Sequence, residues 1–311
     1  MSIIGAGTMG HSIALSIAWV NYSVVVFAIS DEEVQSAKVN VEEKLQTLIE
    51  TQVITTGQAV QIMNCMEFTT ELEECLADTD YVIEAVPEQL ILKQDIFAKI
   101  EQLIAPSIPI ASNTSGIPSK QLIAKLAQPE RFIITHFWNP AHLIPLVEVV
   151  PSSATNDVTM NKTLQLLKHL RKKPIVIKKE LQGFIGNRLQ FALYREAQYL
   201  LDEGIASKED IDTAITHSIA RRLPITGPLM SADLTGLDVV SSICSYLYED
   251  LCNETYLRPV TNKLVDQQKL GLKSSEGFYQ WPTEKAKAIN KQREQLLIDF
   301  LKKDLTQEGI T

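Results

Sequence analysis

The sequence predicts an α/β domain with a doubly wound parallel sheet, followed by an all-helical domain. Residues 1–150 alternate short, β-branched apolar runs with longer amphipathic stretches, and β-like runs stop after Gly183, where helical periodicity takes over. Such alternation is typical of βαβ units packed around a parallel sheet. After a short strand at the N-terminus, the expected strands are Ser23–Phe27, Tyr81–Val86, Pro109–Ser112 and Phe132–His136.

Helical periodicity also sets the expected domain limits. Glu32–Glu50 and Thr55–Met63 predict a helical hairpin, at about residues 32–64, inserted into the first domain. Ile and Leu spaced among Lys, Glu and Gln near the C-terminus predict a surface helix beyond the core. A chain of 311 residues suits two domains of ordinary size. We therefore expect domains at residues 1–182 and 183–281 and a helical extension at 282–311.

Composition narrows the classes of partner. The formal net charge of −9 disfavours non-specific nucleic-acid binding, which needs clustered Lys and Arg. No stretch approaches the roughly 20 uncharged apolar residues of a membrane span. The four cysteines show no CxxC spacing and the five histidines no HxxxH or HExxH pairing, so we expect reduced thiols and no metal. A cytoplasmic protein with a small-molecule substrate, and without nucleic-acid or membrane partners, is the expectation.

A glycine-rich turn follows the first strand. Gly5, Gly7 and Gly10, with Thr8 and Met9 between them, form the pattern GxGxxG, and a helix is expected from His11. Gly5 permits a tight turn, Gly7 lets the backbone approach a pyrophosphate, and Gly10 allows close packing of helix and strand. The helix N-terminus attracts the anion. At the start of a βαβ alternation, this turn predicts a Rossmann-type dinucleotide-binding domain.

The end of the second strand bears on the choice of dinucleotide. An acidic residue there usually binds the adenosine ribose hydroxyls. In this sequence Ala28 follows the strand and Asp31 comes three residues later, so Asp31 either lies past the strand end or reaches back across the loop. Neither Arg nor Lys stands beside Ala28 to take a 2′-phosphate. We therefore expect NAD as the cofactor, with altered ribose recognition.

Three further segments carry polar residues in or just after apolar runs: Ser112–Ser115, His136–Pro140 and Leu146–Val149. Ligands of open α/β sheets bind at the carboxyl ends of strands, so these polar groups should face the cofactor. A lone histidine at a strand end is more often structural, but the nearby Glu148 favours catalysis. Histidine titrates near neutral pH and is suited to accept a hydroxyl proton while hydride leaves the same carbon.

Together with the glycine turn, these segments resemble the L-3-hydroxyacyl-CoA dehydrogenase family, from Ser2 to about Trp281. The segments that resemble the family's helical domain are Gly183–Arg188, Lys208–Asp212, Gly236–Asp238 and Gly277–Tyr279, with Pro228.

The resemblance implies roles for single residues. His136 would be the general base, supported by Glu148, while Ser115 and Asn187 would hydrogen-bond the reacting oxygen. Asn139 would hold the nicotinamide carboxamide.

By the same resemblance, Glu88 and Lys93 should line the nicotinamide-ribose side. A solvated turn and helix start is the alternative reading of these two residues. A homodimer formed through the helical domain is also implied.

The resemblance is less close where the family binds coenzyme A, partly through a Ser and a Lys on the hairpin. Lys44 replaces that Ser and is the candidate substrate-binding residue, while the expected Lys is missing. Negative charge at the hairpin disfavours a phosphate-rich carrier. No Lys or Arg occurs between Lys44 and Lys93, where the acidic residues include Glu50, Glu67, Glu71, Glu73, Glu74, Asp78 and Asp80.

The favoured function is therefore NAD-dependent oxidation of an L-3-hydroxyacyl-CoA to the 3-oxoacyl-CoA. Ile144-Pro145 before Leu-Val-Glu also resembles L-gulonate and carnitine dehydrogenases, so a free 3-hydroxy acid is the alternative substrate. A non-catalytic dinucleotide-binding structural protein, as among crystallin-type relatives, is the second alternative.

Overall fold

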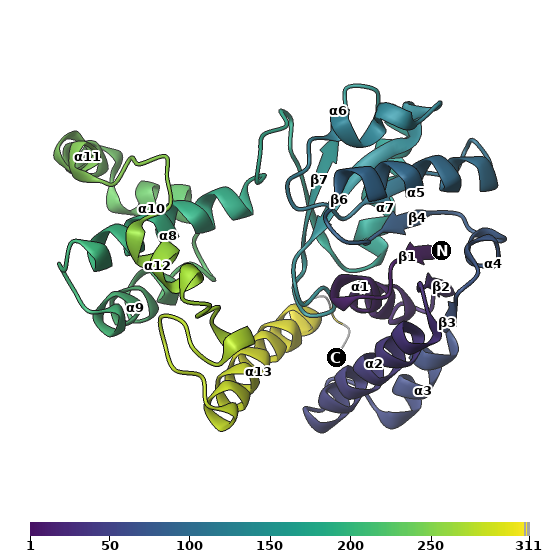
Figure 1. The fold of residues 1–311 in the computed structure, drawn as a ribbon, viewed down its shortest axis with the longest axis horizontal. Helices are drawn as coiled ribbons and strands as arrows, with labels where there is room; N and C mark the ends of the chain where they lie inside the picture. Colours follow the sequence, from purple (N-terminus) through teal and green to yellow (C-terminus); the bar gives the residue numbers. More distant parts are fainter. Residues whose placement is uncertain (308, 310–311) are drawn as a thin grey trace. The chain divides into compact units, whose positions relative to one another are not determined.

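The computed structural model describes residues 1–307 and 309, in two units (Figure 1). The first unit comprises Met1–Ile185 and Gln292–Thr311, and the second comprises Gly186–Lys291. An α/β first part followed by a helical part confirms the predicted fold class.

The first unit is built on an eight-stranded sheet in the order β3-β2-β1-β4-β5-β6-β7-β8. Neighbouring strands are parallel except β6 and β7, which are antiparallel. The strands are β1 (Ser2–Ile4), β2 (Val24–Phe27), β3 (Met66–Thr69), β4 (Val82–Glu84), β5 (Ile110–Ser112), β6 (Phe132–Phe137), β7 (Leu146–Pro151) and β8 (Lys173–Val176).

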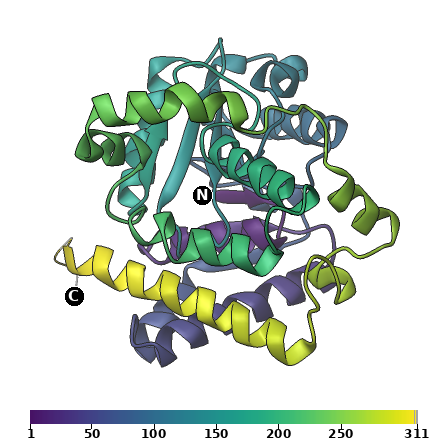
Figure 2. The same cartoon turned by 90° about the vertical axis from the view of Figure 1, so that its left-hand side faces the viewer.

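The helices of the first unit are α1 (Thr8–Ala18), α2 (Asp31–Glu50), α3 (Thr56–Asn64), α4 (Leu72–Leu76), α5 (Leu90–Leu103), α6 (Ser119–Leu122) and α7 (Asp157–His169). The second unit, green in Figure 2, contains α8 (Gly186–Asp202), α9 (Lys208–Thr216), α10 (Pro228–Thr235), α11 (Leu237–Asp250) and α12 (Pro259–Asp266). Short 3₁₀ helices lie at Ile123–Lys125, Pro129–Arg131, Ile219–Arg221 and Leu272–Ser274. The last helix, α13 (Thr283–Gln307), begins in the second unit and ends in the first.

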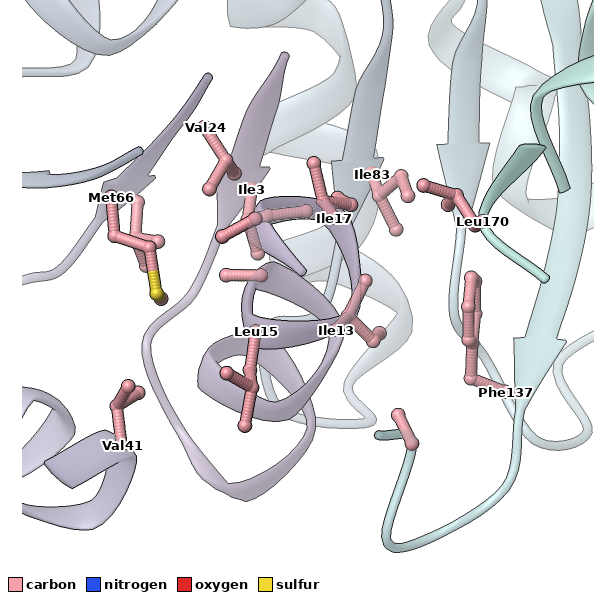
Figure 3. Packing of buried hydrophobic residues seen from close by; sticks show 14 of the residues in the cluster. Ile3, Ile13, Leu15, Ile17, Val24, Val41, Met66, Ile83, Phe137 and Leu170 are labelled. Carbon is pink, nitrogen blue, oxygen red and sulfur yellow. The ribbon is translucent and has the colours of Figure 1, made fainter. Parts of the chain in front are cut away.

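The sheet is covered on both faces because alternate residues of a strand point to opposite sides. Ile3, Ile83 and Ile133 belong to one buried cluster, whereas their neighbours Ile4, Val82 and Phe132 belong to the other. The first cluster also holds α1, which is buried nearly all round and whose Ile13, Leu15 and Ile17 are fully buried (Figure 3). The sheet thereby fixes α1, and with it the glycine turn.

The structure corrects two expectations about the sheet. The antiparallel pair was not predicted; Phe137 and Leu146 are joined by only a short loop, and a parallel connection needs a crossover of about a dozen residues or more. β3 and β8 were also missed, because they carry polar residues such as Glu67 and Lys173. In addition, α1 begins at Thr8 rather than at His11.

Candidate active site

The glycine turn connects β1 to α1 and leaves no room for side chains at two of its positions. Gly5 has φ +109°, and a Cβ there would lie 2.8 Å from the carbonyl oxygen of Ala85. A Cβ on Gly10 would lie 1.7 Å from the carbonyl oxygen of Gly5. At Gly7, the N-cap of α1, a Cβ would meet nothing within 4 Å. Open space beside the N-terminus of a helix fits the pyrophosphate of NAD.

The two residues between these glycines differ in exposure. Thr8 is exposed, and Met9 is half-buried and packs against the first core cluster. Both lie in the first turn of α1, next to the space that the pyrophosphate would occupy.

At the end of β2, the structure offers no carboxylate on the strand itself. Ala28 is fully buried in the first core cluster, so its side chain faces the core. Asp31 is the first residue of α2 and is exposed, after the N-cap Ser30. Ribose recognition by Asp31 therefore stays a prediction.

His136 and Glu148 lie directly opposite each other in the antiparallel β6–β7 pair. Side chains of directly opposed residues point to the same face of a sheet. Nδ1 of His136 lies 2.7 Å from Oε2 of Glu148, and Glu148 is fully buried. Because a carboxylate only accepts hydrogen bonds, the geometry assigns the proton to Nδ1 and leaves Nε2 as the acceptor. This is the arrangement that a histidine base requires.

The backbone before α8 completes the surroundings of this pair. The N–H of Ile185 donates to Oε1 of Glu148 at 2.9 Å. The ring of Phe184, which is 1% exposed, lies 5.6 Å from the imidazole of His136. The carboxylate is thus held from two sides within the first unit.

A second buried network lies at the ends of β4 and β5. Glu84 is fully buried and accepts hydrogen bonds at 2.6 Å from Nζ of Lys93 and from Oγ of Ser112. Burial raises the pKa of Glu84, and these partners oppose that rise. Lys93 is 1% exposed and lies 3.2 Å from Glu88. The solvated alternative is therefore wrong for Lys93.

Glu88 links this network to Ser115. Its Oε1 accepts hydrogen bonds from Oγ1 of Thr114 at 2.6 Å and from the N–H of Ser115 at 3.0 Å. Oγ of Ser115 also lies 3.3 Å from the same oxygen, and Ser115 is exposed. The network therefore positions the loop after β5. Sequence reasoning missed Glu84 and its role; a glutamate inside the apolar run Tyr81–Val86 was the available signal.

The remaining candidate residues belong to neither of these two hydrogen-bond networks as described. Asn139 is exposed and precedes the cis bond to Pro140. Asn187 lies in the first turn of α8, in the second unit, so its contact with the substrate oxygen stays a prediction. Lys44 on α2 is half-buried, donates to the carbonyl oxygen of Asn40 at 3.3 Å, and has a pKa lowered by burial.

Buried side chains donate hydrogen bonds to the backbone of the loop that carries Asn139. Oγ of Ser16 and Nζ of Lys172 both donate to the carbonyl oxygen of Ala141. Oγ of Ser12 lies 3.0 Å from Nδ1 of His142. Burial lowers the pKa of Lys172 to about 7. Burial, and then the charges of Lys44 and Lys172, lower the pKa of His142 to about 3.

The lowered pKa of Lys172 makes folding depend on pH. The unfolded chain binds this proton up to about pH 10.5 and the folded chain only to about pH 7, so stability should rise with pH between these values. We expect the free energy of unfolding to rise from about pH 7.5 to about pH 9 by about 2 kcal/mol more in the wild type than in Lys172→Met. Urea unfolding at the two pH values measures this difference.

The control for this prediction is the neighbouring Lys173→Met, because Lys173 is exposed and pairs with Asp304 at 3.2 Å. That variant should keep the wild-type dependence on pH. Identical pH dependence of wild type and Lys172→Met would show that the buried amine does not titrate in this range.

Among the described residues, no group of three or more His, Cys, Asp or Glu side chains could hold a metal ion. In the same part of the chain, no helix has the length and apolar character needed to cross a bilayer. All four cysteines are free thiols.

Two family profiles match the chain. The profile described as "3-hydroxyacyl-CoA dehydrogenase, NAD binding domain" matches residues 1–181, and "3-hydroxyacyl-CoA dehydrogenase, C-terminal domain" matches residues 183–281. The matched residues include both the glycine turn and the His136–Glu148 pair.

Curated relatives match over most of the chain. 5-Formyl-3-hydroxy-2-methylpyridine 4-carboxylate 5-dehydrogenase of Mesorhizobium japonicum is 32% identical, over 96% of both chains. A probable 3-hydroxybutyryl-CoA dehydrogenase of Deinococcus radiodurans is 35% identical, over 90% of this chain and 99% of the relative.

Solved structures of dehydrogenases are also similar to this chain over most of its length. The crystal structure of a 5-formyl-3-hydroxy-2-methylpyridine 4-carboxylic acid 5-dehydrogenase, described as an NAD⁺-dependent dismutase, has a TM-score of 0.88 at 31% identity and 97% coverage of both chains. That of (S)-3-hydroxybutyryl-CoA dehydrogenase from Ralstonia eutropha has a TM-score of 0.75 at 35% identity, covering 91% of this chain and 98% of the other.

Proposed function

The chain belongs to the 3-hydroxyacyl-CoA dehydrogenase family and is an NAD-dependent oxidoreductase, and from this we propose that it oxidises the 3-hydroxyl of a 3-hydroxyacyl substrate with His136 as proton acceptor. The observation that carries the proposal is the 2.7 Å contact between His136 and the buried Glu148. Both residues lie in the sheet that fixes the glycine turn.

The mechanism follows from what each side chain can do. Nε2 of His136 accepts the hydroxyl proton, and Glu148 stabilises the imidazolium that forms. NAD, when bound, supplies the acceptor for the hydride that leaves the same carbon. Ser115 would donate a hydrogen bond to the substrate oxygen, and the same role is proposed for Asn187. Asn139 would hold the nicotinamide carboxamide, and Gly5 to Gly10 would hold the pyrophosphate, while Glu88 and Lys93 would line the nicotinamide-ribose side.

An L-3-hydroxyacyl-CoA, oxidised to the 3-oxoacyl-CoA, is the first candidate substrate. It is supported by family membership and by the names of the Deinococcus and Ralstonia relatives. Lys44, with Lys38 on the same helix, is the proposed contact for the carrier.

A free hydroxy acid is the second candidate, favoured by α13. The family profile ends at residue 281, before α13. The Mesorhizobium relative, which is named for a pyridine carboxylate, matches 96% of both chains, so its match includes part of α13. Ile298 of α13 is 1% exposed in the first core cluster, and the charge of Glu294 acts on Lys44. A helix packed here leaves Lys44 only half-exposed to a phosphate-rich carrier.

One set of assays separates these candidates. Acetoacetyl-CoA with NADH, and the acids L-gulonate, carnitine and a formyl-substituted pyridine carboxylate with NAD, are followed by the absorbance of the reduced nicotinamide. The acyl-CoA candidate requires turnover of the thioester, and Lys38→Ala/Lys44→Ala should raise its Michaelis constant without changing that for NADH. Lys99→Ala, an exposed lysine of α5, is the matched control. Turnover of acids alone supports the second candidate, and a flat trace throughout contradicts the proposed chemistry.

We also propose a cytoplasmic homodimer formed through the second unit, without nucleic-acid or membrane partners. Soluble monomers rarely expose large apolar patches. The exposed apolar side chains of α10 and α11 include Leu229 at 83%, Leu234 at 75% and Tyr248 at 69%. Sedimentation at micromolar concentration should give twice the 34.7 kDa of one chain, and a single-chain species would contradict the dimer.

A further inference from the structure

Trp138 lies two residues after His136, just beyond the end of β6. Residues two apart along an extended strand point to the same side, so Trp138 and His136 both face Glu148. The indole Nε1 of Trp138 donates a hydrogen bond to Oε2 of Glu148 at 3.3 Å. The same oxygen is the partner of Nδ1 of His136 at 2.7 Å. One carboxylate oxygen is thus shared between the proposed base and an indole.

We propose that Trp138 is a positioning residue that tunes His136 through Glu148. The inference rests on the proposed function of His136 as general base. Trp138 does not need to touch the substrate for this role. It acts by the hydrogen bond to Oε2 of Glu148 and by fixing the carboxylate in the orientation that meets the imidazole.

The physical effect follows from sharing the oxygen. Indole N–H is a donor only, so it can stabilise the anionic carboxylate but cannot accept a proton or a hydrogen bond from His136. A donor to Oε2 draws electron density away from the oxygen that stabilises the imidazolium. Because Glu148 is fully buried, the effect is not diluted by water. Trp138 therefore competes with His136 for the negative charge on Oε2 of Glu148, which an apolar ring at position 138 would not do.

Other neighbours of His136 do not supply this effect. The Phe184 ring contacts the imidazole at 5.6 Å and is uncharged, and the Trp138 ring does so at 5.7 Å. Glu148, from β7, is the charged group in contact with His136 in the described part of the chain. Glu84 and Lys93, on β4 and α5, are hydrogen-bonded to each other in their own network.

The test is Trp138→Phe, which keeps an aromatic ring and removes the donor. If His136 is the base, kcat/KM for oxidation should fall at acid pH, because a protonated base cannot accept the hydroxyl proton. We expect the midpoint of this fall to move up by about 0.5 pH unit, the direction expected when a hydrogen bond to the neighbouring anion is lost. The KM for NAD should not change. The plateau value of kcat/KM, reached at higher pH, should change little. An unchanged midpoint overturns the proposal.

A second measurement needs no turnover. Histidine NMR titration of the cofactor-free protein, with the His136 signal identified by its absence in His136→Gln, should show the same upward displacement in Trp138→Phe. Ile185 donates to Glu148 through its backbone N–H, so Ile185→Val keeps that donor and is the matched control. An active wild type whose His136 titration is identical in Trp138→Phe refutes the tuning role alone, whereas a wild type inactive on every hydroxy substrate refutes the proposed function.

Discussion

His136→Gln should lower turnover by about 100- to 10,000-fold, the usual contribution of general-base catalysis. Glutamine has a similar reach and can donate a hydrogen bond to Glu148, but its amide cannot accept the hydroxyl proton. The glycine turn should be unaffected, because it follows β1, whereas His136 lies on β6, and β4 and β5 separate these strands. Steady-state kinetics gives the turnover, and NADH fluorescence titration with thermal unfolding checks that cofactor binding and stability are retained.

The double mutant with Glu148→Gln tests whether the two residues act as a unit. If Glu148 acts through His136, adding Glu148→Gln to His136→Gln should cost little more, because effects within a catalytic unit are not additive. Two effects that simply multiply would show independent roles. Turnover of His136→Gln equal to that of the wild type would remove His136 from the mechanism.

The strands β1, β2, β4, β5 and β6 and the proposed base could be predicted because both rest on local patterns. Alternating apolar runs specify βαβ units, and GxGxxG specifies the turn after the first strand. His136 and Glu148 could be singled out because polar residues interrupt apolar runs where strand ends gather. Their contact itself depends on antiparallel register, which pairs residue 136 with residue 148, and nothing local in the sequence specifies that register.

Other features of the site depend on contacts between distant segments. The sequence around Lys93 is typical of the start of a surface helix. Lys93 is nevertheless buried, and its amine is hydrogen-bonded to Glu84 of β4. Lys172 reads as one of several basic residues in a turn, but carbonyl groups from the loop after β6 surround its amine. Burial of a charged group is decided by its partners across the fold. Sequence alone therefore identifies the groups but not their environment.

Replacement of single glycines in the turn should separate cofactor binding from folding. We expect Gly10→Ala to weaken NADH binding at least about tenfold and to lower the melting temperature, because close helix–strand packing at this glycine is part of the dinucleotide-binding motif. Its Cβ would lie 1.7 Å from the carbonyl oxygen of Gly5, and backbone at that distance must move. The displaced strand end and helix start carry the pyrophosphate site with them. Fluorescence titration and thermal unfolding measure both effects.

Gly7→Ala is the matched variant, because the same methyl group enters open space there. The melting temperature should stay at the wild-type value, whereas NADH binding should weaken, since the methyl would stand between the N-terminus of α1 and the approaching pyrophosphate. Loss of binding without loss of stability cannot arise from a distorted fold, so it would locate the pyrophosphate at Gly7. Wild-type affinity in Gly7→Ala would place the pyrophosphate elsewhere and leave Gly10 with a purely structural role.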